Sequence, residues 1–279
     1  MSEPVNLPKP LVPDFSSLAI VRGLQVIVTR PLAQAAPWVE TLRAHGHEAH
    51  AVPLIDIEPL ADTKPLRDAW RRLTQFTLVM FVSANAVHHF FAQQPDDADW
   101  PLSALAASTG PGTSAALQQA GLRGAMIVEP LHGAGYDSEA LWARLSHRNW
   151  AQARVLIVRG EEGRDWLAEQ FRQAGAEVLV CAAYRRVAPV HPPEVKAVLA
   201  HAVTHPAQTC WFFSSSEAIG HLLELVPTAD WRSSRALVTH LRIAQAARSA
   251  GFGDVHLVDA QPMSVVGTVR QIQHMPRLG

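Results

Sequence analysis

The sequence predicts an α/β protein with two similar lobes, each built around a parallel β-sheet. Its 279 residues exceed the usual size of one domain and fall short of three. Short β-rich runs alternate with helical patterns of about a dozen residues, which is typical of strand-helix units that feed a parallel sheet. An internal repeat indicates that both lobes follow one plan.

Ten β-rich runs predict the strands of these sheets, and helical patterns fill most of the gaps between them. The first 23 residues contain Pro4, Pro8, Pro10 and Pro13 without periodicity, and we interpret them as a Pro-rich N-terminal extension. The predicted strands are 25–29, 48–54, 77–82, 105–109, 125–128, 154–158, 177–184, 209–213, 236–239 and 255–258.

The repeat joins segments of the first half to segments of the second half, in order and at nearly one offset. The matched pairs are 26–49 with 155–178, 81–90 with 213–222 and 108–122 with 238–252, at shifts of 129, 132 and 130 residues. The alignment pairs Arg30 with Arg159 and Ser83 with Ser215. Three ordered matches indicate a duplicated strand-helix array.

The composition favours a small-molecule partner. Lys and Arg total 24 against 25 for Asp and Glu, so the charge balance offers no electrostatic case for nucleic acid or a membrane surface. Cys181 and Cys210 both lie inside apolar runs, and the N-terminus lacks a secretory signal pattern. No apolar stretch reaches the roughly 18 residues of a membrane span. We therefore expect a cytoplasmic protein with reduced thiols.

Polar and cationic residues follow the predicted strands. Because ligands of open α/β sheets bind outside the carboxyl ends of the strands, these residues are the candidate site. Ser, Thr and Asn start helices, and a helix start presents free N–H groups and a partial positive charge that suit carboxylates or phosphates. The candidates at strand ends are Thr29, Arg30, Ser83, Asn85, Thr109, Gly110, Arg159, Ser214, Ser215, Thr239 and His240.

One motif supports a different hypothesis, a nucleotide-cofactor enzyme. Gly110-x-Gly112-x-x-Ala115 follows a predicted strand, and Glu129 closes the next one, which fits the dinucleotide-binding pattern. The matching segment 238–252 has no glycine before Gly251, however, and Pro111 also suits an ordinary helix start. The loop 159–164 lacks the lysine and hydroxyl of a phosphate-binding loop.

Metal and nucleophile patterns are weak. Segment 45–50 contains three histidines, which could suggest a metal site. The matching turn at 174–179 contains no histidine, so we interpret segment 45–50 as a solvated turn. No Gly-x-Ser-x-Gly elbow occurs, and both cysteines lie within strands. Tyr184, at the end of strand 177–184, is the remaining candidate for an acid.

A series of motifs in order resembles the uroporphyrinogen-III synthase family. The motifs are VTRP (28–31), LxxxG (42–46), PLIDI (53–57), FVSANAV (81–87), GPGT (110–113), RGExGR (159–164), YRR (184–186), FSSSEA (213–218) and RIAxAARxxGF (242–252). The likeness extends from about residue 24 to about residue 270. It departs at the first 22 residues and at Ala84-Asn85, where many members carry Pro or Arg.

The resemblance implies two α/β domains joined by a two-stranded connector, with the site in the interdomain cleft. Residues 24–52 and 187–279 would form one discontinuous domain, and residues 58–180 the other. Residues 53–57 and 181–186 would be the connector strands. The repeat alone would instead divide the chain near residue 150.

The resemblance also implies a reaction. Members close the linear tetrapyrrole hydroxymethylbilane into uroporphyrinogen III with loss of water and inversion of ring D, and they need no metal or organic cofactor. The carboxylate-rich substrate suits helix starts and arginines. We expect this activity from a monomer. The alternative is a non-catalytic two-lobed protein that binds a small anion or a tetrapyrrole.

By the same resemblance, Tyr184 matches the family tyrosine nearest the reacting centre, and we expect it to donate a proton to the departing hydroxyl. Ser83, Thr113, Ser215 and Thr239 match positions that contact the substrate. The further residues expected to bind the substrate are Arg30, Asn85, Gly110, Arg159, Arg164, Ser214 and His240.

Overall fold

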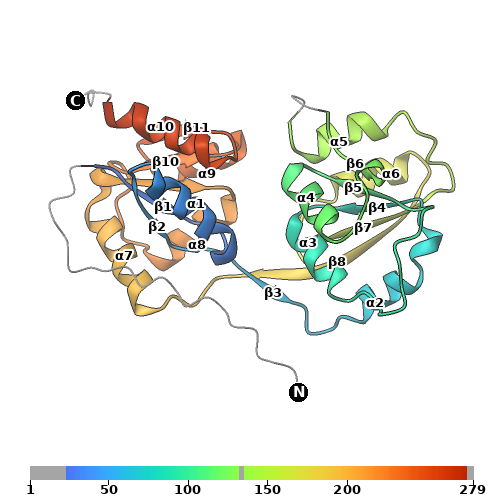
Figure 1. The fold of residues 1–279 in the computed structure, drawn as a ribbon. Coiled ribbons are helices and arrows are strands. Elements are labelled where there is room, and N and C mark those ends of the chain that lie inside the picture. Colours follow the sequence, from blue (N-terminus) through green and yellow to red (C-terminus); the bar gives the residue numbers. More distant parts are fainter. Residues whose placement is uncertain (1–22, 132–134, 275–279) are drawn as a thin grey trace, which may run out of the picture. The chain divides into compact units, whose positions relative to one another are not determined.

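The computed structural model describes residues 23–131 and 135–274. Except for Gly23, the predicted N-terminal extension lies outside the described residues. The chain divides into two compact units: unit 1 contains the residues up to Asp56 and those from Ala188 onward, and unit 2 contains Ile57–Val187. Unit 1 is therefore discontinuous in sequence, and blue and orange elements share it in Figure 1.

Unit 1 contains a five-stranded sheet in the order β11-β10-β9-β1-β2. Its strands are β1 (Gln25–Val28), β2 (Glu48–Ala51), β9 (Thr209–Phe213), β10 (Arg235–Val238) and β11 (Asp254–Leu257), all paired in parallel. The central strands β1 and β9 are buried along their whole length, and apart from their first residues they are apolar, which is typical of a sheet covered on both faces.

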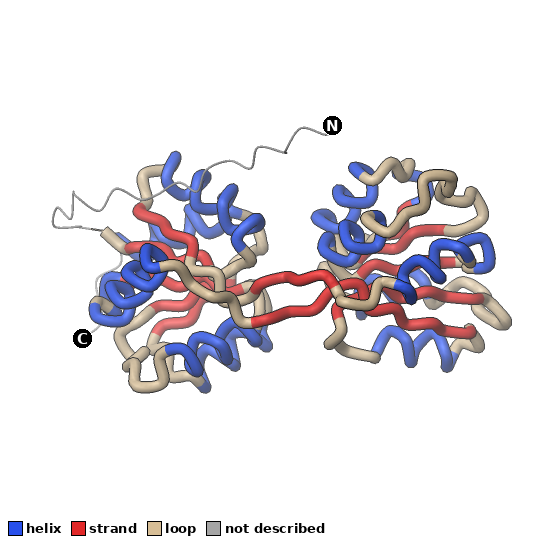
Figure 2. Tube along the Cα trace, turned by 90° about the horizontal axis from the view of Figure 1, so that it is seen from below, coloured by secondary structure: helices blue, strands red, loops and turns tan. Residues whose placement is uncertain are grey.

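The helices of unit 1 cover the sheet on two sides, as Figure 2 shows. They are α1 (Leu32–Ala44), α7 (Pro193–Thr204), α8 (Ser216–Leu225), α9 (Leu241–Ser249) and α10 (Pro262–His274), with a short 3₁₀ turn η4 (Pro206–Gln208). Side chains of α1 and α10 form one core with Val26, Val28 and Phe212. Trp38 stacks on Phe212 in this core, with ring centroids 4.4 Å apart.

Unit 2 contains a six-stranded sheet in the order β3-β8-β7-β4-β5-β6. Its strands are β3 (Asp56–Pro59), β4 (Leu78–Phe81), β5 (Leu105–Ser108), β6 (Ile127–Val128), β7 (Arg154–Gly160) and β8 (Glu177–Val187). The pairs from β8 to β6 are parallel.

The helices of unit 2 pack on both faces of its sheet. They are α2 (Lys64–Arg71), α3 (Ala84–Phe91), α4 (Pro111–Gln119), α5 (Ser138–Leu145) and α6 (Trp166–Gln173), with 3₁₀ turns η2 (Leu73–Gln75) and η3 (Gly124–Met126). Alternation along β4 divides the core: Val79 and Phe81 pack with α2, α3 and α4, whereas Leu78 and Met80 pack with α5 and α6.

The predicted α/β class with parallel sheets is confirmed, and each of the ten predicted strands has a counterpart. The strand predicted at 48–54 ends at Ala51, two residues before Pro53, which has no N–H for a ladder. The strand predicted at 125–128 is only Ile127–Val128 and follows a 3₁₀ turn. The predicted connector segments 53–57 and 181–186 overlap β3 and the last part of β8, which are neighbours in one sheet.

Within the described ranges, no helix is long and apolar enough to cross a membrane.

Candidate active site

The carboxyl ends of parallel strands bring the predicted site residues to one edge of each sheet. In unit 1 this edge holds Arg30, Ser214, Ser215, Thr239 and His240, and in unit 2 it holds Ser83, Asn85, Gly110, Thr113, Arg159 and Arg164. Helix starts follow most of these ends, so main-chain N–H groups point outward there. Each edge can therefore receive anionic groups.

Ser83 is the N-cap of α3 and has a second polar partner. Its extended backbone (φ −164°, ψ 163°) lets Oγ accept a hydrogen bond of 3.2 Å from the Ala86 N–H. The same Oγ lies 3.1 Å from the Tyr184 hydroxyl oxygen. Asn85 is the second residue of the helix. The cap predicted at Ser83 is thus present, and it contacts the predicted acid.

A β-bulge determines where Tyr184 points. Arg159 pairs with Ala182 but Gly160 pairs with Tyr184, so Ala183 is an extra residue in β8. Side chains normally alternate along a strand. The extra residue resets this alternation, and Ala183 and Tyr184 both join the core that contains α3. The Tyr184 side chain is 0% exposed.

Three further residues hold the Tyr184 ring. The His89 ring is stacked on it with centroids 5.8 Å apart, and a Cβ at Gly160 would lie 3.1 Å from its Cε2. Arg186 Nη2 donates to the Tyr184 hydroxyl oxygen at 3.5 Å, with the guanidinium carbon 5.9 Å from the ring centre. Sequence patterns indicated no role for these three residues. The spacing of Arg186 two residues after Tyr184 on one strand is the signal that could have indicated it.

Arg159 and Arg164 already hold carboxylates of unit 2. Arg159 Nη1 lies 2.9 Å from Asp165 Oδ1, and Arg164 Nη2 lies 2.6 Å from Glu139 Oε1. A substrate carboxylate would have to displace these partners or share the guanidinium groups with them. The structure therefore presents both arginines as members of ion pairs.

The start of α4 contains an internal hydrogen-bond chain. Gly110 is its N-cap without a side-chain cap, and Thr113 is buried in the first turn. Ser114 Oγ donates to Glu129 Oε2 at 2.5 Å, so the 2.6 Å contact of Ser108 Oγ with Ser114 Oγ has Ser108 as the donor. Glu129, the acidic residue of the dinucleotide-type pattern, is thus engaged by a helix of its own unit.

Ser215 repeats in unit 1 the cap that Ser83 makes in unit 2. Its Oγ accepts a hydrogen bond of 3.2 Å from the Glu217 N–H at the start of α8. Ser214 lies just before it and is half-buried. The Ser216 Oγ is buried and has no hydrogen-bond partner among the described residues.

Arg30 is a half-buried cation at the end of β1. Its Nη2 donates to Gln34 Oε1 at 2.9 Å, and its guanidinium carbon lies 5.2 Å from the centre of a Trp38 ring. Its Nε is buried and has no hydrogen-bond partner in the part of the chain that the structure describes. Burial lowers the pKa of Arg30, because desolvation penalises the charged form. A carboxylate at this guanidinium would offset that penalty.

Thr239 and His240 follow β10 as predicted. His240 is an exposed N-cap of α9, and its Nδ1 accepts a hydrogen bond of 3.1 Å from the Arg242 N–H. Neutral His240 must then carry its proton on Nε2, which leaves that N–H available as a donor. Thr239 is half-buried beside it.

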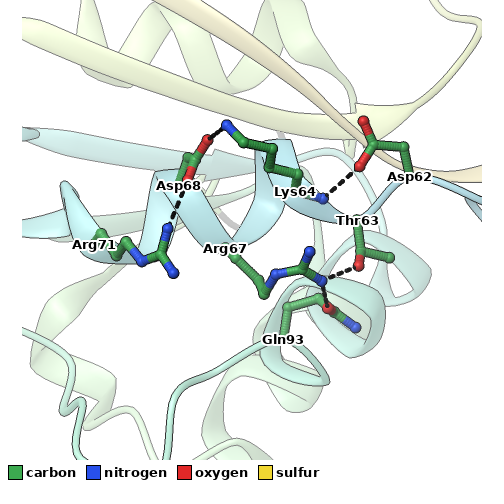
Figure 3. A network of polar contacts seen from close by, with 7 residues as sticks. All are labelled: Asp62, Thr63, Lys64, Arg67, Asp68, Arg71 and Gln93. Atoms are coloured by element: carbon green, nitrogen blue, oxygen red, sulfur yellow. Dashed lines mark hydrogen bonds and ion pairs between the residues drawn. The ribbon is translucent and has the colours of Figure 1, made fainter.

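A second polar network lies on α2 and is shown in Figure 3. Asp68 pairs with Lys64 at 2.5 Å and with Arg71 at 3.0 Å, and Arg67 donates to Thr63 and to Gln93. Gln93 follows the C-terminal end of α3, whereas Ser83 caps its N-terminal end. This network therefore lies away from the strand-end site. Among the described residues, no group of three His, Cys, Asp or Glu side chains is placed to hold a metal.

Comparisons with known proteins agree on one family. The family model described as uroporphyrinogen-III synthase HemD matches residues 36–262. The chain is 32% identical to the uroporphyrinogen-III synthase of Salmonella typhimurium and 30% identical to that of Escherichia coli, and each match covers 85% of this chain and 95% of the relative.

Solved structures show the same fold. A mutant uroporphyrinogen III synthase from the extremely thermophilic bacterium Thermus thermophilus matches with a TM-score of 0.59 over 91% of this chain and 100% of its own, at 20% identity. The Helicobacter pylori enzyme matches with a TM-score of 0.56 over 89% of this chain and 99% of its own, at 11% identity. On the strength of the family and sequence matches, this chain belongs to the uroporphyrinogen-III synthase family.

Proposed function

We propose that this chain closes hydroxymethylbilane into uroporphyrinogen III, with loss of water and inversion of ring D, and that the strand-end edges described above carry out the reaction. The observation that carries this assignment of roles is the pairing of a capped helix start with a buried phenol at one strand end, where Ser83 meets Tyr184. Family membership supports the reaction itself.

Substrate carboxylates are bound at helix starts and at one cation. Ser83, Ser215 and His240 cap their helices through side chains, and their neighbouring N–H groups suit carboxylate oxygens. Gly110, Thr113, Asn85, Ser214 and Thr239 belong to the same edges. Arg30 supplies the charge-assisted contact, because its Nε has no partner among the described residues. Arg159 and Arg164 bind a substrate carboxylate only if it displaces Asp165 and Glu139 or shares the guanidinium groups with them.

Tyr184 is the proton source for the departing hydroxyl. A phenol is protonated at neutral pH, as a proton donor must be. The rest of the catalysis is geometric: the site must hold ring D so that closure with inversion outruns direct head-to-tail closure. No part of this scheme draws on a metal or an organic cofactor.

The chain is expected to act as a cytoplasmic monomer. Burial raises the pKa of Cys181 to about 11 and that of Cys210 to about 12, so both thiols stay protonated and packed. Such thiols suit a reducing compartment. Size-exclusion chromatography with light scattering would test the monomer, and a dimer mass would contradict it.

The decisive experiment is incubation of the purified chain with freshly made hydroxymethylbilane, followed by oxidation and chromatographic separation of the type I and type III products. A buffer-only reaction gives the background of direct closure, which is type I. We expect type III product in proportion to the amount of enzyme. Type I product alone, at the buffer rate, would mean that the chain is a binding protein without this activity.

A further inference from the structure

Of the two hydroxyl groups in the Ser83–Tyr184 pair, the one that a ligand at the strand-end edge can reach is that of Ser83, because Tyr184 is covered. Tyr184 is 0% exposed, whereas Ser83 is half-buried at the start of α3. The two side-chain oxygens lie 3.1 Å apart. A ligand at this edge can therefore meet the Ser83 hydroxyl while the phenol remains behind it.

The hydrogen bonds around this pair have a defined direction. A guanidinium can only donate, so the 3.5 Å contact makes Arg186 the donor and the Tyr184 oxygen the acceptor. The Ala86 N–H likewise donates to Ser83 Oγ. If Tyr184 donates its own proton to Ser83, the proton of Ser83 is left free to point toward a ligand.

The tyrosine is held in the geometry that such a transfer requires. The bulge at Ala183 directs Tyr184 toward α3, and the absence of a side chain at Gly160 makes room for its ring. His89 stacks on the same ring. Arg186 lies where a positive charge would offset the negative charge of a phenolate.

From this geometry we infer that Ser83 relays the proton from Tyr184 to the substrate, so that Ser83 is the residue in contact with the reacting group and Tyr184 acts through it. This inference rests on the proposed function, since it needs a departing hydroxyl as the acceptor. It assigns to a helix cap a part in proton transfer in addition to binding.

The proton transfer balances for atoms and charge. The carbon–oxygen bond of the hydroxymethyl group breaks, its electron pair stays on oxygen, and that oxygen takes the Ser83 proton and leaves as water. Ser83 Oγ takes the Tyr184 proton, which leaves a phenolate beside Arg186 and a positive charge on the terminal pyrrole. The proton that the ring system loses after closure returns through Ser83 to Tyr184.

A serine cap can form without a neighbouring tyrosine, as unit 1 shows. Strands β1 and β2 pair Gln25 with Glu48, and β7 and β8 pair Arg154 with Glu177, which is the same register at a shift of 129 residues. That shift places Ile55 at the position of Tyr184. Ser215 thus caps α8 through the Glu217 N–H while the position that matches Tyr184 carries an aliphatic side chain.

The test compares Ser83→Ala, Tyr184→Phe and the double variant under single-turnover conditions with hydroxymethylbilane. A relay predicts that each single change lowers the rate of type III formation by a similar factor, of about 10² or more, and that the double change lowers it little further. Ser83→Thr retains a hydroxyl and a cap, so it should restore most of the rate.

Asp137→Ala is the matched control for loss of a cap. Asp137 Oδ1 accepts a hydrogen bond of 2.8 Å from the Ala140 N–H at the start of α5 in the same unit. If Ser83→Ala lowers the rate no more than this control does, or if the two losses multiply in the double variant, the relay is wrong. The proposed function would still stand if the wild type makes type III product, and it would fall only if the wild type makes type I product alone.

A measurement on the wild type keeps the inference testable if Ser83→Ala does not fold. Single-turnover rates in mixtures of H₂O and D₂O depend on the number of protons in flight. Two protons moving together give a curved plot against the deuterium fraction, and a straight line with a normal isotope effect would contradict the relay.

Discussion

Unit 1 and unit 2 start equivalent helices with the same serine cap, but they surround that cap differently. Ser215 in unit 1 and Ser83 in unit 2 both accept a main-chain hydrogen bond of 3.2 Å. Only Ser83 also contacts a phenol, because β8 carries a tyrosine where unit 1 has Ile55. The duplicated scaffold thus contains the serine cap in both units and the adjacent phenol in unit 2 alone, among the described residues.

Arg30 and Arg159, which the internal repeat matches, also have different surroundings. Arg30 in unit 1 has a buried Nε without a partner among the described residues, whereas Arg159 in unit 2 pairs with Asp165 at 2.9 Å. Arg159 thus holds a carboxylate of its own unit, whereas Arg30 has a buried N–H that an external carboxylate could accept from. On this difference we propose that unit 1 contributes mainly to binding and unit 2 mainly to chemistry.

The largest effect is expected for Tyr184→Phe. Removing one hydroxyl should lower the turnover number by about 10²- to 10⁴-fold, the usual contribution of a general acid, with KM changed much less. Steady-state kinetics of type III formation measure both constants. The control is Tyr136→Phe, which removes the only other phenol in the chain, on a side chain that is 55% exposed. An unchanged turnover number in Tyr184→Phe would exclude the acid role.

Arg30→Met and Arg159→Met test the division between binding and chemistry. Loss of a hydrogen bond to a charged group costs about 1.5–3 kcal/mol, so Arg30→Met should raise KM by about tenfold to a hundredfold with turnover nearly unchanged. Arg159→Met removes a pair whose carboxylate is 56% exposed, and it should raise KM less. Equal increases in KM would contradict the proposed asymmetry.

Replacing a glycine by alanine should lower the stability of the protein at Gly160 in unit 2 and raise it at Gly220 in unit 1. In Gly160→Ala the new Cβ would lie 3.1 Å from the Tyr184 ring, which should destabilise the protein by about 1–3 kcal/mol and lower turnover. Gly220 lies in α8 with open space around its Cβ position, so Gly220→Ala should stabilise the protein by about 0.5–1 kcal/mol. Urea unfolding compares the two, and a neutral Gly160→Ala would mean that the Tyr184 ring is free to shift.

The smallest expected effect is the pH dependence of stability that comes from His89, the histidine stacked on the Tyr184 ring. Burial, with a smaller contribution from His88, lowers the pKa of His89 in the folded protein. The unfolded chain then binds the proton more readily, so stability should fall as the pH decreases through the ordinary histidine pKa of about 6.5. His89→Phe keeps an aromatic ring and should show a weaker loss of stability over this range in urea unfolding. An equal loss in both proteins would assign the pH dependence to other groups.

Local patterns predicted the fold well, because they depend on residues close in sequence. The run LVMF became β4 and TCWFF became β9, since buried parallel strands are apolar on both faces. Ser83 and Ser215 became helix caps at the predicted places, whereas after β10 the cap is His240 and not the neighbouring Thr239. The β-rich pattern did not predict β3, because Asp56–Pro59 has a proline and two acidic residues, which suit an edge strand and not a buried one.

The details of the site depended on contacts that sequence spacing does not contain. The bulge at Ala183 is visible only in the pairing of β7 with β8, so strict alternation gives no basis for Tyr184 joining the α3 face. Arg164 forms an ion pair with Glu139, 25 residues earlier, and Arg159 forms one with Asp165 across a loop. These tertiary pairs were not predicted from the sequence.

The two cysteines also give each unit an internal reporter of local opening. Cys210 belongs to the core of unit 1 and Cys181 to a core of unit 2, and they are the only cysteines in the chain. Both are buried and protonated, so an alkylating reagent can modify either one only after its unit opens. Mass spectrometry of the two peptides would therefore time the opening of each half separately in the unaltered protein, with and without substrate.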